Sequence, residues 1–358
     1  MISDNIAKKK ASLLKKIFAA LCIVAIGFII WSGVNDAFRD STLNIMDNVV
    51  AVSAGSNHTM AIRVDDSLWA WGSNFHGQLG VGTSMSQNTP VKIMDDVVAV
   101  SAGSNHTMAI RVDGSLWAWG WNKFGQLGDG TVIDRHTPVK IMDDVIAVSA
   151  GNDYTIAIKA DGNLWAWGSN WTGQLGDGTV KDRHSPIKIV EDVIAVSAGS
   201  DHTMAIKTDG SLWAWGNNFH GQLGDSTIVS RNIPVKIMDD VIAVSAGTLH
   251  TMTIKADGSL WAWGNNWAGQ LGDGTTVRYR QAPVKIMDNV IAVSAGWSHT
   301  AAIKTDGSLW VWGGGRDSTT AIDQLTPVKI MDDVVAVSVR SNHTMAIRND
   351  NSLWVLER

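Results

Sequence analysis

The sequence of 358 residues contains one cysteine, Cys22, and only two tyrosines, six phenylalanines and six prolines. A single cysteine excludes an internal disulfide and a zinc site built from cysteine thiolates. Charged residues make up 18% of the chain, below the typical quarter, which excludes a disordered, charge-rich protein. After residue 41 no stretch has a sustained apolar period of 3.6 residues, so we expect almost no helix in that region.

Charge is distributed unevenly along the chain. Residues 1–34 contain five lysines and one aspartate, a balance of +4, while the whole chain carries −5, so the remaining residues together carry −9. An acidic body repels phosphate backbones. We therefore expect no nucleic-acid partner.

An uncharged apolar run at residues 17–34 directly follows these lysines. As a helix it would be about 27 Å long, at the short limit for crossing a bilayer. Lysines on one flank match the positive-inside pattern. We expect residues 1–16 to form a basic cytoplasmic head, 17–34 a transmembrane anchor or the hydrophobic region of a signal sequence, and 35–40 a short linker to an extracytoplasmic body. A cleaved secretory signal, which would release the body, is the alternative.

The body at residues 41–358 is one unit repeated. Each unit divides into four short strands with alternating apolar residues, and in the fourth unit Asp209 and Gly210 mark a two-residue hairpin. A four-stranded repeat of 40–50 residues is typical of a propeller blade. The glycine of a W-x-W-G element recurs every 48 residues, and after 49 at the last step, at Gly72, Gly120, Gly168, Gly216, Gly264 and Gly313.

The number of half-units predicts how the ring closes. The front half, from S-A-G to W-x-W, occurs seven times, and the back half occurs six times. The missing back half matches residues 43–48, at the start of the body. We expect an all-β, seven-bladed β-propeller of four-stranded antiparallel blades, in which residues 41–48 pair with the third strand at 352–356 and leave no free edge.

Tryptophan is unusually abundant, with 18 residues, and thirteen of them belong to the W-x-W elements: six complete pairs, and Trp354 in the last unit, where leucine replaces the second ring. Alternation along a strand places both rings of an element on one face. Burying one indole removes about 200 Å² from water. We interpret all thirteen rings as packing between blades, and we expect Trp165→Ala to cost about 3–5 kcal/mol.

Three motifs recur in a fixed order, A-G-x-x-H-T, D-G-S-L-W-x-W-G and N-x-x-G-Q-L-G, the last of them for example at residues 77–80. Together they resemble the regulator of chromosome condensation repeat over residues 41–358, and the chain is similar to a bacterial seven-bladed member. The resemblance implies a seven-bladed propeller. The namesake of the family is a nuclear exchange factor for a small GTPase, and its bacterial members include secreted propellers, one group of which inhibits β-lactamases. This chain departs from the repeat at Arg340, which replaces a recurrent glycine, and at Tyr154, which replaces a recurrent histidine.

The recurrent histidines occur once per unit. That spacing disperses them too widely to share one metal ion, so we expect them to bond to neighbouring loop backbone. No serine, cysteine or paired-carboxylate set occurs once and out of register, as a catalytic set would. We expect no enzyme activity, no cofactor and no metal. The six histidines are His58, His106, His202, His250, His299 and His343.

The aromatic residues that break the repeat are the candidate partner-binding residues. In a four-stranded meander the first-to-second and third-to-fourth connections emerge on one face, and aromatic residues on variable loops are typical of recognition surfaces. We expect a membrane-tethered scaffold that binds a protein, or a glycan, through this face. The alternatives are an inhibitor of an extracellular enzyme, a guanine-nucleotide exchange factor, or rings that only cover loop interiors. The candidates are Phe75, Trp121, Phe124, Tyr154, Trp171, Phe219, Trp267 and Trp297.

Overall fold

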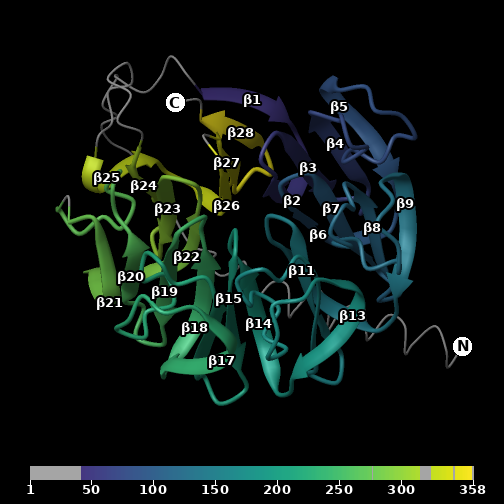
Figure 1. Ribbon diagram of the computed structural model, residues 1–358. Coiled ribbons are helices and arrows are strands. Elements are labelled where there is room, and N and C mark those ends of the chain that lie inside the picture. Colours follow the sequence, from purple (N-terminus) through teal and green to yellow (C-terminus); the bar gives the residue numbers. More distant parts are fainter. Residues whose placement is uncertain (1–41, 276, 315–323, 342, 357–358) are drawn as a thin grey trace, which may run out of the picture.

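Seven sheets of four antiparallel strands surround one axis in the computed structural model (Figure 1), which describes residues 42–356 except 276, 315–323 and 342. The predicted all-β, seven-bladed propeller is confirmed for this part of the chain. The predicted head, anchor and linker at residues 1–16, 17–34 and 35–40 lie outside the described residues. Within the described ranges, no helix has the length and apolar character needed to cross a bilayer.

Each blade runs from an inner strand at the axis to an outer strand at the rim (Figure 1). The inner strands are β2 (Val49–Ala54), β6 (Val97–Ala102), β10 (Val145–Ala150), β14 (Val193–Ala198), β18 (Val241–Ala246), β22 (Val290–Ala295) and β26 (Val334–Arg340). The second strands are β3 (His58–Arg63), β7 (His106–Arg111), β11 (Tyr154–Lys159), β15 (His202–Lys207), β19 (His250–Lys255), β23 (His299–Lys304) and β27 (His343–Arg348). The third strands are β4 (Leu68–Gly72), β8 (Leu116–Gly120), β12 (Leu164–Gly168), β16 (Leu212–Gly216), β20 (Leu260–Asn265), β24 (Leu309–Gly313) and β28 (Leu353–Leu356). The outer strands are β5 (Gln87–Met94), β9 (Arg135–Met142), β13 (Arg183–Val190), β17 (Arg231–Met238), β21 (Tyr279–Met287), β25 (Gln324–Met331) and β1 (Thr42–Met46).

The meander gives the ring two different faces. The loop face carries the connections that follow the inner and the third strands, and the turn face carries those that follow the second and the outer strands. On the loop face the short connections are 55–57, 103–105, 151–153, 199–201, 247–249 and 296–298, and the long ones are 73–86, 121–134, 169–182, 217–230 and 266–278.

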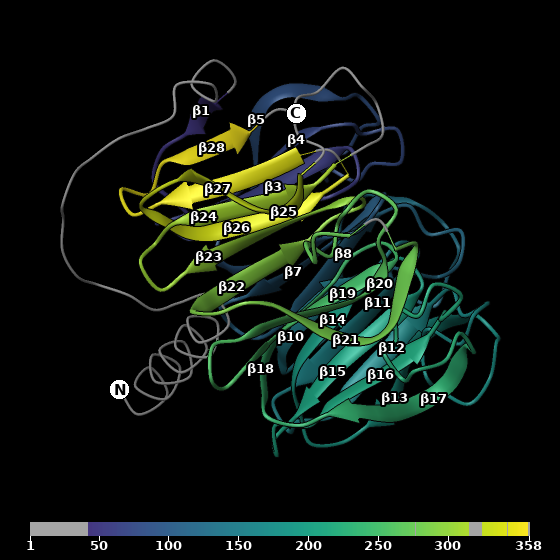
Figure 2. The same ribbon diagram turned by 90° about the vertical axis from the view of Figure 1, so that its left-hand side faces the viewer.

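The first strand of the body completes the last blade. β1 pairs antiparallel with β28, with Thr42 opposite Leu356 and Met46 opposite Leu353 (Figure 2). β2 then begins the first blade after a two-residue turn. The two ends of the described chain therefore share one sheet, and the seventh blade has four strands like the others.

A ring of serine hydroxyls joins the inner strands. Ser53 Oγ accepts the backbone N–H of Ala102 in the next blade at 2.9 Å, and Ser338 Oγ accepts the N–H of Ala54 at 3.0 Å. The junction between the last and first blades is therefore made by the same bond as the others. The remaining pairs are Ser101 with Ala150, Ser149 with Ala198, Ser197 with Ala246, Ser245 with Ala295, and Ser294 with Val339, each at 2.9 Å.

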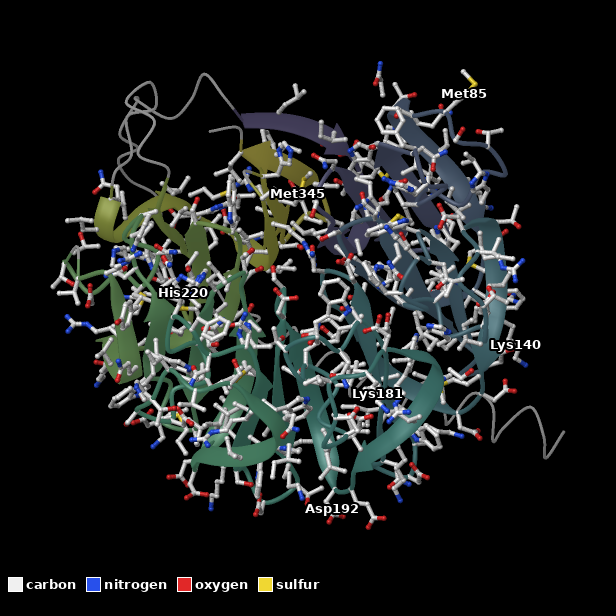
Figure 3. All side chains as sticks on the ribbon, viewed as in Figure 1. Met85, Lys140, Lys181, Asp192, His220 and Met345 are labelled. Atoms are coloured by element: carbon white, nitrogen blue, oxygen red, sulfur yellow. The ribbon has the colours of Figure 1, made fainter. Side chains whose placement is uncertain are left out.

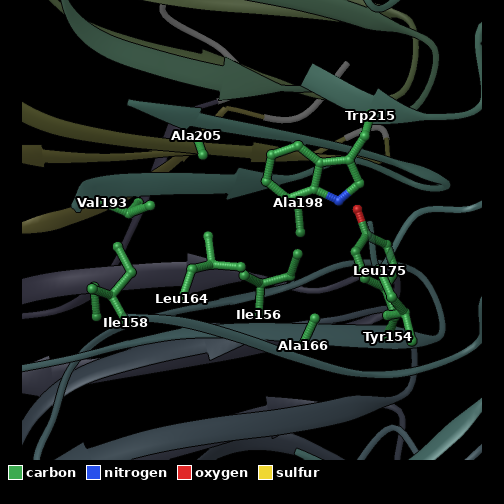
Figure 4. Close-up of a cluster of buried hydrophobic side chains, with 11 residues drawn as sticks. Tyr154, Ile156, Ile158, Leu164, Ala166, Leu175, Val193, Ala198, Ala205 and Trp215 are labelled. Atoms are coloured by element: carbon green, nitrogen blue, oxygen red, sulfur yellow. The ribbon is translucent and has the colours of Figure 1, made fainter. Parts of the chain in front are cut away.

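The second tryptophan of the W-x-W element is the main packing residue between blades. Trp119 is fully buried, and its Nε1–H donates to the carbonyl oxygen of Gln78 in the preceding blade at 2.9 Å. Gly80, at φ +82°, lies so close that a Cβ there would be 2.8 Å from Trp119 Nε1. The G-Q-L-G loop of one blade therefore covers the indole of the next. Trp167, Trp215 (Figure 4), Trp263 and Trp312 are buried in the same way.

The first tryptophan of the element also packs between blades, as Trp117 does against the cluster shared by the first and second blades, but it is only half-buried instead of fully buried. Trp117 donates its Nε1–H to Ser115 of its own blade at 2.9 Å. It stands at the start of β8, near the turn face, whereas the G-Q-L-G loop lies on the loop face. Trp71 supports this explanation. It is the second tryptophan of its element, but the seventh blade, which precedes it in the ring, has no G-Q-L-G loop to cover it, and Trp71 is half-buried.

Candidate functional site

The recurrent histidine links each blade to the next one. His58 Nε2 lies 3.0 Å from Thr107 Oγ1, and the Thr107 hydroxyl donates to Gln78 O at 2.8 Å. A hydroxyl has one proton, so the histidine donates through Nε2–H. The predicted structural role is therefore found, but the partner is a threonine hydroxyl of the next blade instead of loop backbone. Equivalent histidine–threonine contacts join His106 to Thr155, His202 to Thr251, His250 to Thr300 and His299 to Thr344.

Four of these five histidines are neutral at physiological pH. The pKa of His58, His106, His202 and His250 is lowered to about 3, mainly by burial, and for the first two the charge of Arg340 contributes to this shift. The Nδ1 atom of each of the four is buried without a hydrogen-bond partner. In the part of the chain that the structure describes, no group of three or more His, Cys, Asp or Glu side chains is placed to hold a metal ion.

Tyr154 occupies the histidine position of the third blade. Its side chain is fully buried, its hydroxyl donates to the carbonyl oxygen of His202, and Thr203 Oγ1 lies 3.1 Å from that hydroxyl (Figure 4). Burial raises the pKa of the Tyr154 hydroxyl far above its ordinary value. The prediction that Tyr154 belongs to the partner-binding surface is therefore wrong, because the residue starts β11 and the fourth blade covers it.

Five of the other predicted residues are exposed on the loop face. Four of them stand near the start of a long loop, and Trp297 stands in a short connection of the sixth blade. Their exposed fractions are 77% for Phe75, 69% for Trp171, 63% for Phe219, 57% for Trp297 and 48% for Trp267. These side chains come from the first, third, fourth, fifth and sixth blades, so the apolar surface extends around most of the ring.

Trp121 and Phe124 are half-buried and belong to a row of aromatic rings across three blades. The His76 ring lies 5.4 Å from that of Trp121. Trp121 meets Phe124 edge-on at 5.6 Å, and Phe124 meets Trp171 edge-on at 5.8 Å. Edge-to-face contacts of this kind stabilise aromatic pairs beyond the area that they bury. The structure thus brings three of the predicted residues into direct contact.

The long loops are held rigidly by polar side chains. In the third blade Asn170 Oδ1 accepts the N–H of Leu175 at 3.0 Å, and its Nδ2 donates to Asp177 at 3.0 Å. Asp177 also pairs with Arg183 at 2.6 Å. Burial alone would raise the pKa of Asp177, but hydrogen bonds from Thr179, Arg183 and Asn170 hold it below its usual value. The exposed rings therefore stand on a preorganised surface.

Arg340 crosses the axis at the loop face. Its guanidinium donates to the carbonyl oxygens of Ala102 at 3.1 Å, Ala150 at 3.3 Å and Gly151 at 3.1 Å. Burial lowers the pKa of Arg340 to about 10, so the side chain remains charged. The seventh blade is thereby tied to the second and third blades. Sequence reasoning noted that Arg340 replaces a glycine but gave it no role.

Two neighbouring carboxylates, Asp153 and Asp201, lie on the loop face, and Asp153 is close enough to Arg340 to feel its charge. Burial and the charge of Asp201 raise the pKa of Asp153 to about 6, although Arg340 lowers it, and Asp153 Oδ1 is buried without a hydrogen-bond partner. Burial also raises the pKa of Asp201. Sequence reasoning missed this pair. The sequence signal for this pair is the change of residue at one repeat position: the first two blades have asparagine there, at Asn57 and Asn105, and the next two have Asp153 and Asp201.

Comparison with known proteins identifies relatives of the whole ring. Residues 34–287 match the RCC1-like domain, and residues 290–318 match the regulator of chromosome condensation (RCC1) repeat. Yeast RCC1 (Prp20), solved with Kap60, superposes with a TM-score of 0.75 at 22% identity, covering 87% of this chain and 80% of that chain. Human WBSCR16 superposes with a TM-score of 0.73 at 23% identity, covering 88% of each chain.

In sequence, the Ultraviolet-B receptor UVR8 of Arabidopsis thaliana is 46% identical over 41 residues, which is 12% of this chain and 9% of the receptor. The match thus spans less than a tenth of that receptor. A separate structure of Prp20p from Saccharomyces cerevisiae, described with its binding to Gsp1p and histones, has a TM-score of 0.71 at 22% identity and covers 86% of this chain and 81% of that chain. At these identities the structural likeness shows the fold.

Proposed function

This chain belongs to the RCC1-like domain family, and from that premise we propose that it is a membrane-tethered, extracytoplasmic interaction scaffold that binds a protein partner through its loop face. The observation that carries the proposal is the set of five exposed aromatic side chains on one face of a rigid ring. Exposed apolar surface of this kind marks interaction sites, and interface cores are enriched in Trp and Phe. The yeast relative solved with Kap60 supports a protein as the class of partner.

The membrane tether is the second part of the proposal. Residues 17–34 cross the membrane, residues 1–16 remain in the cytoplasm, and the propeller lies outside. The uncharged run and the lysines on its cytoplasmic flank support this orientation. Protease added to intact cells is expected to digest the propeller and to spare the lysine-rich head, and digestion of both or of neither contradicts the orientation.

We assign the propeller no catalytic activity, no cofactor and no nucleic-acid partner. Inhibition of an extracellular enzyme is one form of the proposed function, in which the enzyme is the partner. Guanine-nucleotide exchange is disfavoured because an extracytoplasmic propeller does not meet a cytoplasmic GTPase.

The partner-binding test replaces three exposed rings by alanine: Trp171, Trp267 and Trp297. Loss of such anchors typically costs 1–2 kcal/mol or more each, so the triple variant is expected to capture its cell-surface partner at least about 10-fold less well at an unchanged melting temperature. Val64→Ala is the matched control, because Val64 is exposed on the turn face. Undiminished capture by the folded triple variant, or a glycan instead of a protein in the captured fraction, contradicts the proposal.

A further inference from the structure

We infer that the loop face is turned toward the membrane that holds the tether, and that the protein it binds is embedded in that same membrane. The inference rests on the proposed function and adds to it the orientation of the propeller and the kind of partner.

The first step is where the chain joins the ring. β28 runs from the turn face to the loop face, because the connection before it belongs to the turn face. Thr42 pairs with Leu356, the last residue of β28, and Met46 pairs with Leu353, the first (Figure 2). Thr42 therefore lies at the loop-face end of the outer strand, and the preceding chain leaves the propeller at the rim of the loop face.

The second step is the length of the tether. Seven residues, 35–41, separate the apolar run from Thr42. Fully extended, they reach about 25 Å at most. If the turn face were directed to the bilayer, the tether would first have to return along the five residues of β1, which takes about 17 Å. Little length would remain, so the tether favours the loop face toward the membrane.

The third step is the distribution of exposed apolar side chains. Among the described residues, 20 large hydrophobic side chains are exposed, and 14 of them lie on the loop face or at the strand ends beside it. Several long loops present an aromatic ring near the start and an aliphatic side chain near the end, and Met85 projects clearly from the rim (Figure 3). The 14 are Leu43, Phe75, Met85, Val132, Ile133, Trp171, Val180, Phe219, Ile228, Val229, Ile233, Trp267, Val277 and Trp297.

The fourth step is the charge of this face, which favours a protein over lipid as the occupant. Within the described ranges, the loop-face connections and adjoining strand ends contain eight aspartates and eight lysines or arginines. A zero balance gives no net attraction to an anionic leaflet, whereas interfacial surfaces are usually rich in Lys and Arg. The Trp171 Nε1–H donates to Asp182 at 3.3 Å, which places a carboxylate beside the exposed ring. The eight acids are Asp129, Asp134, Asp153, Asp177, Asp182, Asp201, Asp225 and Asp273, and the eight bases are Lys123, Arg135, Lys181, Arg183, Arg231, Arg278, Arg280 and Arg340.

The orientation is tested on the full chain in lipid vesicles by spin labels. Cys22→Ala removes the natural thiol. Val180→Cys then places a label on the loop face, and Val64→Cys is the matched turn-face control, because the two valines are 58% and 52% exposed. With nickel-chelating headgroups in the bilayer, relaxation enhancement is expected to be several-fold larger at residue 180 than at residue 64. An equal or reversed ratio overturns the orientation.

The same labels separate a protein partner from lipid. In vesicles without a partner, the label at residue 180 is expected to stay accessible to a water-soluble nickel complex. A label that is shielded from this complex but accessible to oxygen would mean that the bilayer itself occupies the face, which overturns the protein part of the inference. If alkaline carbonate extracts the chain from vesicles, the tether and the proposed function fail, whereas a retained chain with a reversed ratio overturns the orientation alone.

The partner is tested by a short photo-crosslinker in place of Trp267 in intact cells. The expected adduct contains a protein that remains with the membrane after alkaline carbonate. An insertion of about 30 Gly and Ser residues between Asp40 and Ser41 is expected to reduce this adduct several-fold, because a longer tether lowers the effective concentration of the face at the membrane. An adduct with a carbonate-soluble protein, or a yield unchanged by the longer tether, overturns the inference.

Discussion

Two tryptophans separated by one residue have different roles because different neighbours cover them. Trp167 is fully buried and donates to Gln126 O at 2.9 Å in the preceding blade. Trp165 is half-buried, and its Nε1 lacks a hydrogen-bond partner because Asn163 stands where the other blades have serine. The second ring of the W-x-W element therefore contributes more to the free energy of unfolding than the first.

Replacement of each ring by alanine tests this difference. Trp167→Ala is expected to lower the free energy of unfolding by about 3–5 kcal/mol, because it leaves a large cavity and an unpaired carbonyl oxygen. Trp165→Ala is expected to cost about half as much, less than the sequence alone indicated. Urea denaturation of both variants measures the difference, and equal losses would contradict it.

The buried histidines make the stability of the ring depend on pH. The pKa of His58, His106, His202 and His250 is about 3 in the folded protein, against 6.5 as the ordinary value. Between these pH values the unfolded chain binds protons that the folded chain excludes. The stability is fully present above pH 6.5 and falls as the pH is lowered, by up to about 1.4 kcal/mol per pH unit for each histidine.

We therefore expect the melting temperature to fall steadily from pH 7 to pH 4. His106→Tyr is the control, because Tyr154 shows that a tyrosine is accommodated at this position. This variant removes one of the four low-pKa histidines, so its melting temperature is expected to fall by about a quarter less over the same range. A melting temperature that is flat between pH 7 and pH 5 would show that the histidines do not titrate on unfolding.

At the scale of the element, the inner strand β26 extends one residue further than the other six, and that residue, Arg340, stands where a glycine follows the other strands. The equivalent glycine packs against the histidine ring of its own blade, as Gly55 does, where a Cβ would lie 2.3 Å from the His58 ring. Arg340 replaces this glycine and extends its side chain across the axis to three carbonyl oxygens of other blades. The seventh blade, which contains both ends of the described chain, thus gains a link that the other blades do not need.

Replacement of Arg340 by leucine is expected to lower the free energy of unfolding by about 2–4 kcal/mol, because partly buried carbonyl oxygens lose charged donors. Arg340→Lys keeps the charge but has fewer donors, and an intermediate loss is expected. Thermal unfolding of the two variants gives the order. A leucine variant as stable as the unchanged protein would show that water replaces the guanidinium without cost.

At the scale of the whole molecule, the ring depends on β1 as the fourth strand of the seventh blade. Deletion of residues 41–48 exposes the edge of β28 and uncovers the packing of Ile45 and Met46 against the cluster between the last and first blades. We expect cooperative unfolding at a temperature at least about 10 °C lower, and a tendency of the free edge to aggregate. Calorimetry measures the shift.

A circular permutant is the matched control for this deletion. Thr42 and Leu356 lie opposite each other, so a short Gly-Ser linker can join them, and new ends can be placed at Val180 in a long loop. This permutant keeps every blade and is expected to melt within a few degrees of the unchanged protein. If the deletion variant were as stable as the permutant, β1 would not be what closes the ring.

The repeat in the sequence determined the architecture, because its signals are local. Strand alternation, the Asp-Gly hairpins and the 48-residue interval define a four-stranded unit, and the unequal numbers of half-units show that the first strand belongs to the last blade. The same local rules also identified the exposed rings Trp171 and Phe219 as interruptions of the repeat.

What only the tertiary structure decided are the contacts between blades. The burial of Tyr154, the half-exposure of Trp165 and the bonds from Arg340 to carbonyl oxygens as far as 238 residues away all depend on which neighbour is brought against each side chain. Strand period and turn chemistry act over a few residues, whereas these contacts form only when the ring is closed. A sequence pattern therefore specifies the blade, and the packing of blades around the axis specifies which of its side chains remain on the surface to bind.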